Sequence, residues 1–197
     1  MDFNAIFTRA KNILIRPATE WEVVKGETSD KNAVLKDYAL PLIILVAIAS
    51  FLGGLIFTRF GLLIGYVVAK AVGDFIVAFL GIYISAIVIN ELASSFGSKK
   101  DTNAAFKLVI YSFTPVLIAL AVYYLIPILF FVLIFGLYLV YLLWMGLGSL
   151  MGTPEDKKVG YVIVSALLIF VIYALLTFFR GLILTTIFVT SSAAGVL

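Results

Sequence analysis

Residues Leu108 to Thr153 read LVIYSFTPVLIALAVYYLIPILFFVLIFGLYLVYLLWMGLGSLMGT, without a single charged side chain. One continuous helix of this length would be about 70 Å long, more than twice the roughly 30 Å thickness of a bilayer's hydrocarbon core. The stretch therefore predicts two membrane-crossing helices. We expect the break at Tyr124-Leu125-Ile126-Pro127, because proline favours the first turn of a helix and keeps the residue before it out of helical geometry.

The composition of the whole chain indicates that lipid is its solvent. Apolar residues make up 63% of the 197 residues, charged residues only 13%, and the mean hydropathy is +1.18. Soluble domains are about half apolar and a quarter charged, and a chain this short has too little interior to bury the surplus. The net charge of +3 comes from basic residues scattered among acidic ones, so we expect no nucleic-acid partner.

Three further apolar stretches bring the expected number of membrane spans to five. The sequence therefore predicts an all-α fold, a polytopic membrane bundle of five transmembrane helices preceded by an N-terminal amphipathic helix. We expect a cytoplasmic, interfacial segment over 1–37 and a transmembrane domain over 38–197, with spans at about 38–58, 66–93, 105–125, 127–151 and 160–189.

The distribution of basic residues predicts the orientation of the chain. Cytoplasmic loops of membrane proteins carry an excess of Lys and Arg. With the N-terminus inside, the cytoplasmic side collects most of them, and Arg59 falls in an outer loop. An odd number of spans then places the C-terminus outside. Asp2 and Asn4 interrupt the apolar pattern at the start of the chain, so we expect no cleavable signal peptide there.

The N-terminal segment holds apolar residues at helical spacing. Phe3, Ile6, Phe7 and Leu14 recur beside basic residues, a pattern typical of an amphipathic helix in the membrane interface. A helix that caps the transmembrane bundle would show the same pattern. The sequence alone does not distinguish the interfacial helix from the capping helix.

Three charged residues fall inside the predicted spans. Lys70 and Asp74 are four residues apart and can pair on one face of the second span, and Arg180 lies at a comparable depth in the fifth. A charge at membrane depth costs roughly 2.5–3.5 kcal/mol on insertion scales, so it requires a partner or a role. We predict a cluster of these three residues, either a lock between spans or part of a path for a solute or protons.

A proline within the third span predicts a helix kink. Tyr111, Ser112 and Thr114 lie around Pro115 in this span. Such kinks occur at functional cavities and also where they only shape packing.

The sequence carries no sign of catalytic chemistry. It has no cysteine and no histidine, which removes thiolate nucleophiles, histidine-based triads and the usual zinc sites. It also lacks a glycine-rich phosphate loop and a nucleophile elbow. We therefore expect no catalytic residues, no cofactor and no metal.

Several short motifs resemble the bacterial branch of the Yip family, membrane proteins named as Ypt/Rab GTPase-interacting proteins. The resemblance rests on Ile15-Arg16-Pro17 with Glu20-Trp21, Tyr38-Ala39-Leu40-Pro41, Tyr111-Ser112-Phe113-Thr114-Pro115, and Tyr138 to Gly148 ahead of Pro154-Glu155 and Lys157. It implies a five-span bundle with a cytoplasmic N-terminus. Eukaryotic members are implicated in vesicle traffic, Rab GTPase binding and membrane shaping. This chain lacks their Asp-Leu-Tyr-Gly-Pro motif, which argues against GTPase binding here.

Two hypotheses for function follow from these observations. The first is a non-enzymatic membrane scaffold or adaptor of the bacterial inner (plasma) membrane, whose partners are the lipid bilayer and other membrane proteins or further copies of itself. The second is a small transporter or channel that uses Lys70, Asp74 and Arg180. An intramembrane enzyme is a third and weaker alternative.

Overall fold

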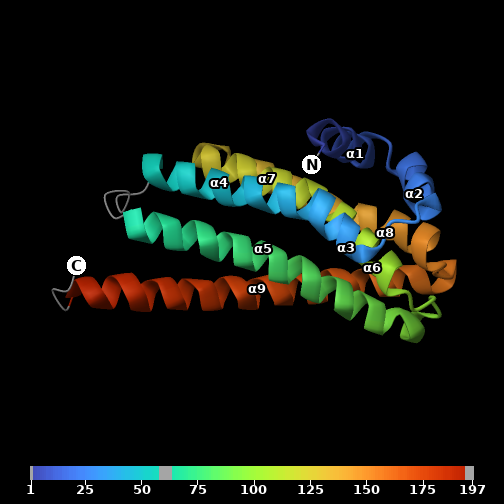
Figure 1. Ribbon diagram of the computed structural model, residues 1–197. Coiled ribbons are helices and arrows are strands. Elements are labelled where there is room, and N and C mark those ends of the chain that lie inside the picture. The colour runs from blue at the N-terminus through green and yellow to red at the C-terminus, as the bar shows by residue number, and fades with distance from the viewer. Residues whose placement is uncertain (1, 58–63, 194–197) are drawn as a thin grey trace.

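The computed structural model describes residues 2–57 and 64–193, with side chains described as far as residue 188. These residues form helices and connecting loops, and none of them lies in a β-strand. Five helices are long and apolar enough to cross a membrane: Lys31–Phe57, Ile64–Phe96, Thr102–Leu125, Pro127–Met151 and Glu155–Phe188. The predicted all-α bundle with five membrane-spanning helices is confirmed (Figure 1).

Shorter helical elements make up the five spans and the N-terminal segment. In chain order they are α1 Phe3–Ile15, α2 Pro17–Gly26, α3 Lys31–Val34, η1 Leu35–Ala39, α4 Leu40–Phe57, α5 Ile64–Leu92, η3 Ala93–Phe96, α6 Thr102–Ser112, α7 Thr114–Leu125, η4 Pro127–Leu137, α8 Tyr138–Met151 and α9 Glu155–Ala193.

The boundaries of the spans differ from the expected ones mainly at the first helix. Asp30 caps α3 by accepting a hydrogen bond from the backbone N–H of Ala33 at 2.8 Å, so helix begins seven residues before the expected start at Tyr38. The third span ends at Leu125, and Ile126 leaves helical geometry before Pro127. The expected outer-loop residue Arg59 and residue 58, the expected end of the first span, lie outside the described residues.

The spans are arranged differently in the two halves of the bundle. Toward the ends near residues 57 and 64, they form a row in which η4 packs against α7, α7 against α4, α4 against α5, and α5 against α9. In the opposite half, α6 lies between α5 and α8, and α8 also contacts α9 and α2. The bundle is therefore closed around α6 in one half and open between η4 and α9 in the other.

The fourth span begins with an unusual helix. η4 is a 3-10 helix of 11 residues, although 3-10 runs longer than three or four residues are uncommon. None of its residues is buried, and Ile128, Phe130 and Ile134 are among its exposed side chains. Because η4 packs chiefly on α7, most of its apolar surface faces away from the protein.

The N-terminal segment is part of the packed core. Trp21 on α2 is fully buried and lies against Gly146 on α8, where a β-carbon would come within 3.0 Å of the indole ring. Tyr111 of α6 contacts the same indole edge-to-face, with ring centroids 6.3 Å apart. Glycine at position 146 thus allows α2 to dock on the spans.

Candidate functional site

The structure brings Lys70, Asp74 and Arg180 together inside the bundle. Lys70 and Asp74 lie one turn apart on α5, and Arg180 reaches them from α9. Two further residues join the cluster that the sequence did not single out, Ser50 of α4 and Tyr124 of α7. A single carboxylate therefore connects four of the five spans.

Both oxygens of the Asp74 carboxylate accept two hydrogen bonds each. Oδ2 accepts from Ser50 Oγ at 2.5 Å and from Lys70 Nζ at 2.9 Å, and Lys70 Nζ also lies 2.7 Å from Ser50 Oγ. Oδ1 accepts from Tyr124 Oη at 3.1 Å and from Arg180 Nη1. Asp74 is 4% exposed, and its four donors complete the acceptor capacity of a carboxylate.

This geometry suits a structural connection between helices. Lys70 Nζ lies 4.3 Å from the centroid of the Tyr124 ring, so the ring face also stabilises the ammonium group. A proton or solute that used Asp74 would have to displace one of four donors that are already in place. The two cations keep about a fifth of their side-chain surface exposed, whereas the carboxylate is almost fully covered.

The residues around Pro115 form a break between two helices. α6 ends at Ser112, α7 begins at Thr114, and Phe113 lies between them. Thr114 Oγ1 lies 2.8 Å from Tyr38 Oη, and the Tyr111 and Tyr38 rings meet edge-to-face at 4.8 Å. These two contacts with Tyr38 hold the third span against the first span beside the break.

The predicted amphipathic helix α1 has two apolar faces. Ile6, Ala10 and Ile13 are buried against the bundle, whereas Phe3 and Phe7 are 72% and 71% exposed. Leu14 is partly buried at the end of the helix. Ile6 and Leu14 therefore meet the bundle, whereas Phe3 and Phe7 do not. Contact of the exposed side chains with the membrane interface stays a prediction.

Charged contacts that the sequence did not reveal hold the N-terminal segment together. Arg9 of α1 bridges Glu20 of α2, at 2.5 Å, and Glu27 just beyond α2. Burial lowers the pKa of Arg9, but Tyr111 and the two carboxylates more than reverse this effect and leave the pKa above its ordinary value. The Arg9 guanidinium therefore stays charged and links the two helices.

Lys107 of α6 binds the end of the same N-terminal segment. Its side chain is buried, and Nζ donates to the backbone carbonyl of Glu27 at 2.7 Å and to that of Val24 at 3.4 Å. Carbonyls at the C-terminal end of a helix lack partners within the helix and attract a cation. Spacing in the sequence does not reveal this contact, because the two carbonyls lie 83 and 80 residues earlier in the chain.

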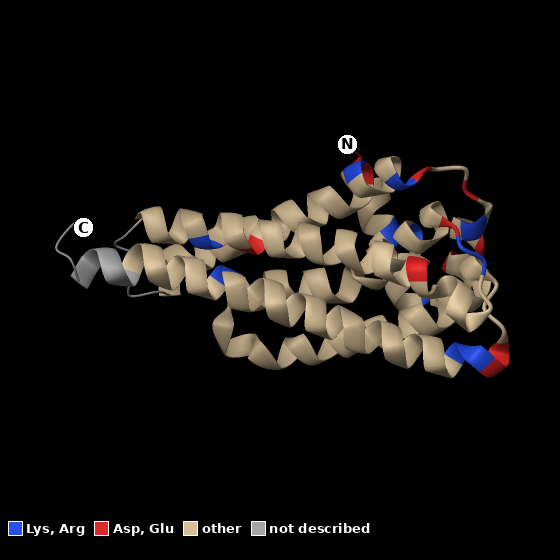
Figure 2. Cartoon of the chain, turned by 90° about the horizontal axis from the view of Figure 1, so that it is seen from below, with Lys and Arg blue, Asp and Glu red and all other residues tan. Residues whose placement is uncertain are grey.

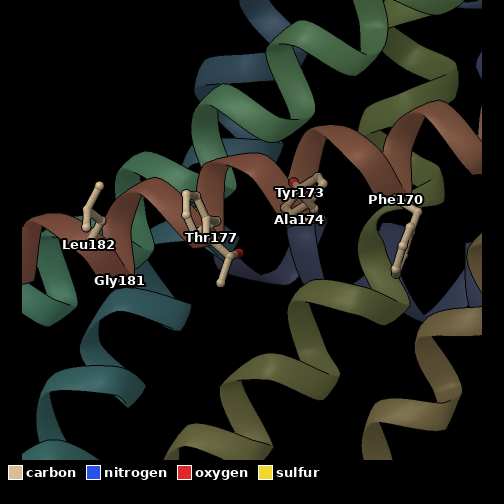
Figure 3. A pocket seen from close by; sticks show the side chains of 7 residues that line it. Phe170, Tyr173, Ala174, Thr177, Gly181 and Leu182 are labelled. Carbon is tan, nitrogen blue, oxygen red and sulfur yellow. The ribbon is translucent and has the colours of Figure 1, made fainter. Parts of the chain in front are cut away.

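The surface of the molecule has several hollows, which differ in volume and in the elements that line them. One, of about 620 Å³, is lined only by residues of α9, among them Phe170, Thr177 and Gly181, and Figure 3 shows them along one side of that helix. A second, of about 790 Å³, lies between α1 and the start of the first span, beside Arg9 and Tyr38. A third, of about 480 Å³, is an apolar groove between α7 and η4.

Figure 2 shows the charged residues gathered at the end of the bundle away from the C-terminus, with few along the remaining length. Together with the five apolar helices, this pattern defines a multi-pass helical membrane protein. The chain belongs to the Yip1 domain family, whose model matches residues 11–178. The expected family is thus confirmed, and the match includes Ser50, Lys70, Asp74 and Tyr124 and ends just before Arg180. No curated protein and no solved structure matches the chain.

Proposed function

We propose that the chain is a non-enzymatic scaffold or adaptor that binds membrane proteins or lipids in the bacterial inner (plasma) membrane, with its N-terminus in the cytoplasm and its C-terminus outside. The observation that carries the proposal is the outer face of α1. Phe3, Phe7 and Ile15 are each at least 66% exposed, while the adjacent face with Ile6, Ala10 and Ile13 is anchored to the bundle. A fixed helix that displays large apolar side chains at the membrane interface is suited to engage lipid or a neighbouring protein.

Charge distribution supports the proposed orientation. The basic residues of α1, α2, the loop after η3 and the start of α9 lie at one end of the bundle, and cytoplasmic ends of spans are enriched in Lys and Arg. The absence of cysteine and histidine from the sequence supports a non-enzymatic role.

Substitution of the exposed face of α1 tests the proposal. The double variant Phe3→Ser/Phe7→Ser keeps Ile6, Ala10 and Ile13 and should leave the bundle intact. We expect fewer membrane proteins and lipids to be recovered with the variant after cross-linking in membranes and quantitative mass spectrometry. Val23→Ser, on the 49% exposed Val23 of α2, is the matched control and should recover the same partners as the parent. Equal recovery with the double variant would contradict the proposal.

The Asp74 cluster gives a second candidate, a small transporter or channel. Ionisable side chains within membrane spans often mark ion or proton pathways. The full set of four donors around Asp74 favours a structural role instead. Flux of protons or ions into vesicles containing the parent protein, lost in Asp74→Asn at equal folded content, would support transport over the scaffold.

A further inference from the structure

We propose that the apolar groove between α7 and η4 holds part of an acyl chain of an anionic phospholipid from the cytoplasmic leaflet, with its phosphate bound by Lys11 of α1 and by Arg16, the residue that follows α1. The inference deepens the proposed function, on whose orientation it rests, by naming the class of lipid and its site. The groove has a volume of about 480 Å³ and lies between the third and fourth spans.

The two walls of the groove run along the direction of the spans. On α7, Pro115, Ala119 and Val122 recur at intervals of four and three residues and form one stripe about 10 Å long. On the facing wall, Val132 and Phe135 of η4 and Tyr138 of α8 are each three residues apart. Side chains three residues apart eclipse one another in a 3-10 helix, so this wall is straight. A straight, apolar channel of this kind matches part of an extended hydrocarbon chain.

The N-terminal helix lies at one end of the groove. Leu14 lines the groove, and its backbone carbonyl accepts a hydrogen bond from Tyr138 Oη at 3.1 Å. This bond ties the end of α1 to the start of α8, and therefore fixes α1 across the mouth of the groove. A lipid in the groove would have its headgroup at the level of α1.

Basic side chains beside that mouth supply a complementary charge. Lys11 lies three residues before Leu14 on α1, so the two are neighbours on the helix surface, and Arg16 lies two residues beyond Leu14. Both side chains are exposed, and within the described part of the chain neither forms an ion pair. Two unpaired cations next to an apolar channel favour a ligand with a phosphate and an acyl chain.

Photo-crosslinking in vesicles tests the site. The full chain is reconstituted in vesicles of phosphatidylcholine and phosphatidylglycerol, in which either lipid carries a photoactivatable acyl chain. We expect labelled phosphatidylglycerol to react preferentially with the peptides that contain Val122 and Phe135. Lys11→Gln and Arg16→Gln should each reduce the preference for phosphatidylglycerol about fivefold, the usual effect of one basic residue near a membrane surface. Lys36→Gln, on an exposed lysine of η1, is the matched control and should not change it.

Blocking variants separate a site from ordinary lipid contact. Val122→Phe and, independently, Ile118→Phe place a ring in the groove and should abolish the preferential labelling. Ala47→Phe fills a similar apolar hollow between α4 and α5, of about 330 Å³, and should leave it unchanged. Labelling spread evenly over all spans, equal reaction of both lipids, or cross-links between two copies of the chain across the groove would overturn the proposal.

The groove variants also separate this site from the broader scaffold role. They leave Phe3 and Phe7 in place, so recovery of protein partners through the outer face of α1 should persist when groove labelling is lost. Loss of protein partners in Phe3→Ser/Phe7→Ser with groove labelling unchanged would support the scaffold and the lipid site as independent properties.

Discussion

The backbone carbonyl of Tyr124 on α7 lies directly against the α-carbon of Gly53 on α4, so that no β-carbon would fit between the two helices. Glycine at this position lets the first and third spans approach closely just above the Asp74 cluster. The contact explains how Tyr124 comes within hydrogen-bond distance of a carboxylate on a third helix.

Replacement of this glycine should separate α4 from α7. Gly53→Ala forces a methyl group against a backbone atom that cannot rotate away, and overpacking of this kind costs about 1–3 kcal/mol. We expect a lower free energy of unfolding in steric-trapping measurements. Gly181→Ala, where nothing lies within 4 Å of the added β-carbon, is the control and should be neutral or stabilising, since alanine favours helix.

Removal of the Asp74 charge should destabilise the bundle strongly. Asp74→Asn leaves Lys70 and Arg180 in the spans without a counter-charge, and breaking a buried ion pair costs about 3 kcal/mol or more. Thermal unfolding in detergent measures the loss. Glu91→Gln breaks an exposed ion pair with Lys100 and should cost less than about 1 kcal/mol. Similar effects of the two substitutions would show that the cluster is not a lock between spans.

The Arg9 bridge should fix α1 on the protein. Arg9→Gln removes both contacts with Glu20 and Glu27, and we expect faster hydrogen exchange at the backbone amides of α1 with little change in the transmembrane helices. Arg9→Lys keeps the charge but lacks the planar fork that contacts two carboxylates at once, so it should restore protection only in part. Full protection in Arg9→Gln would mean that packing of Ile6, Ala10 and Ile13 alone holds the helix.

Loss of Lys107 should release the loop that follows α2. Lys107→Met keeps a long side chain but leaves the carbonyl of Glu27 without the donor that Lys107 supplies, and leaves the carbonyl of Val24 with only the backbone N–H of Glu27, at a cost of about 1–3 kcal/mol. Limited proteolysis between residues 26 and 31 should become faster than in the parent. Lys25→Met, on the exposed surface of α2, should leave the rate unchanged.

The sequence was sufficient for the architecture because hydrophobicity and length alone determine which segments cross a membrane. The uncharged run around Pro127 required two spans, and the structure breaks at Ile126. The sequence was not sufficient to predict the residues that bind Asp74. Ser50 and Tyr124 come from other helices, and whether their hydroxyls face Asp74 depends on how each helix is rotated against its neighbours. Spacing within one helix reveals pairs such as Lys70 and Asp74 but carries no information on that rotation.

The sequence could not predict which face of α1 is buried, for a similar reason. Ile13 is fully buried, yet nothing in the spacing of Phe3, Phe7 and Leu14 says which side of the helix meets protein and which meets lipid, because both environments select apolar residues. The 3-10 geometry of η4 likewise has no counterpart in composition, since its residues would suit an α-helix equally well.

Because Arg180 lies on the last span, the residues of the Asp74 cluster are synthesised in two stages. Ser50, Lys70, Asp74 and Tyr124 belong to the first three spans and leave the ribosome first, whereas Arg180 follows only when the fifth helix is made. Lys70 and Asp74 lie on one helix and can pair as a locally neutral unit before the fifth helix is present. The final helix then adds Arg180, which pairs with Asp74. A chain truncated before this helix therefore lacks one of the two cations that bind the Asp74 carboxylate.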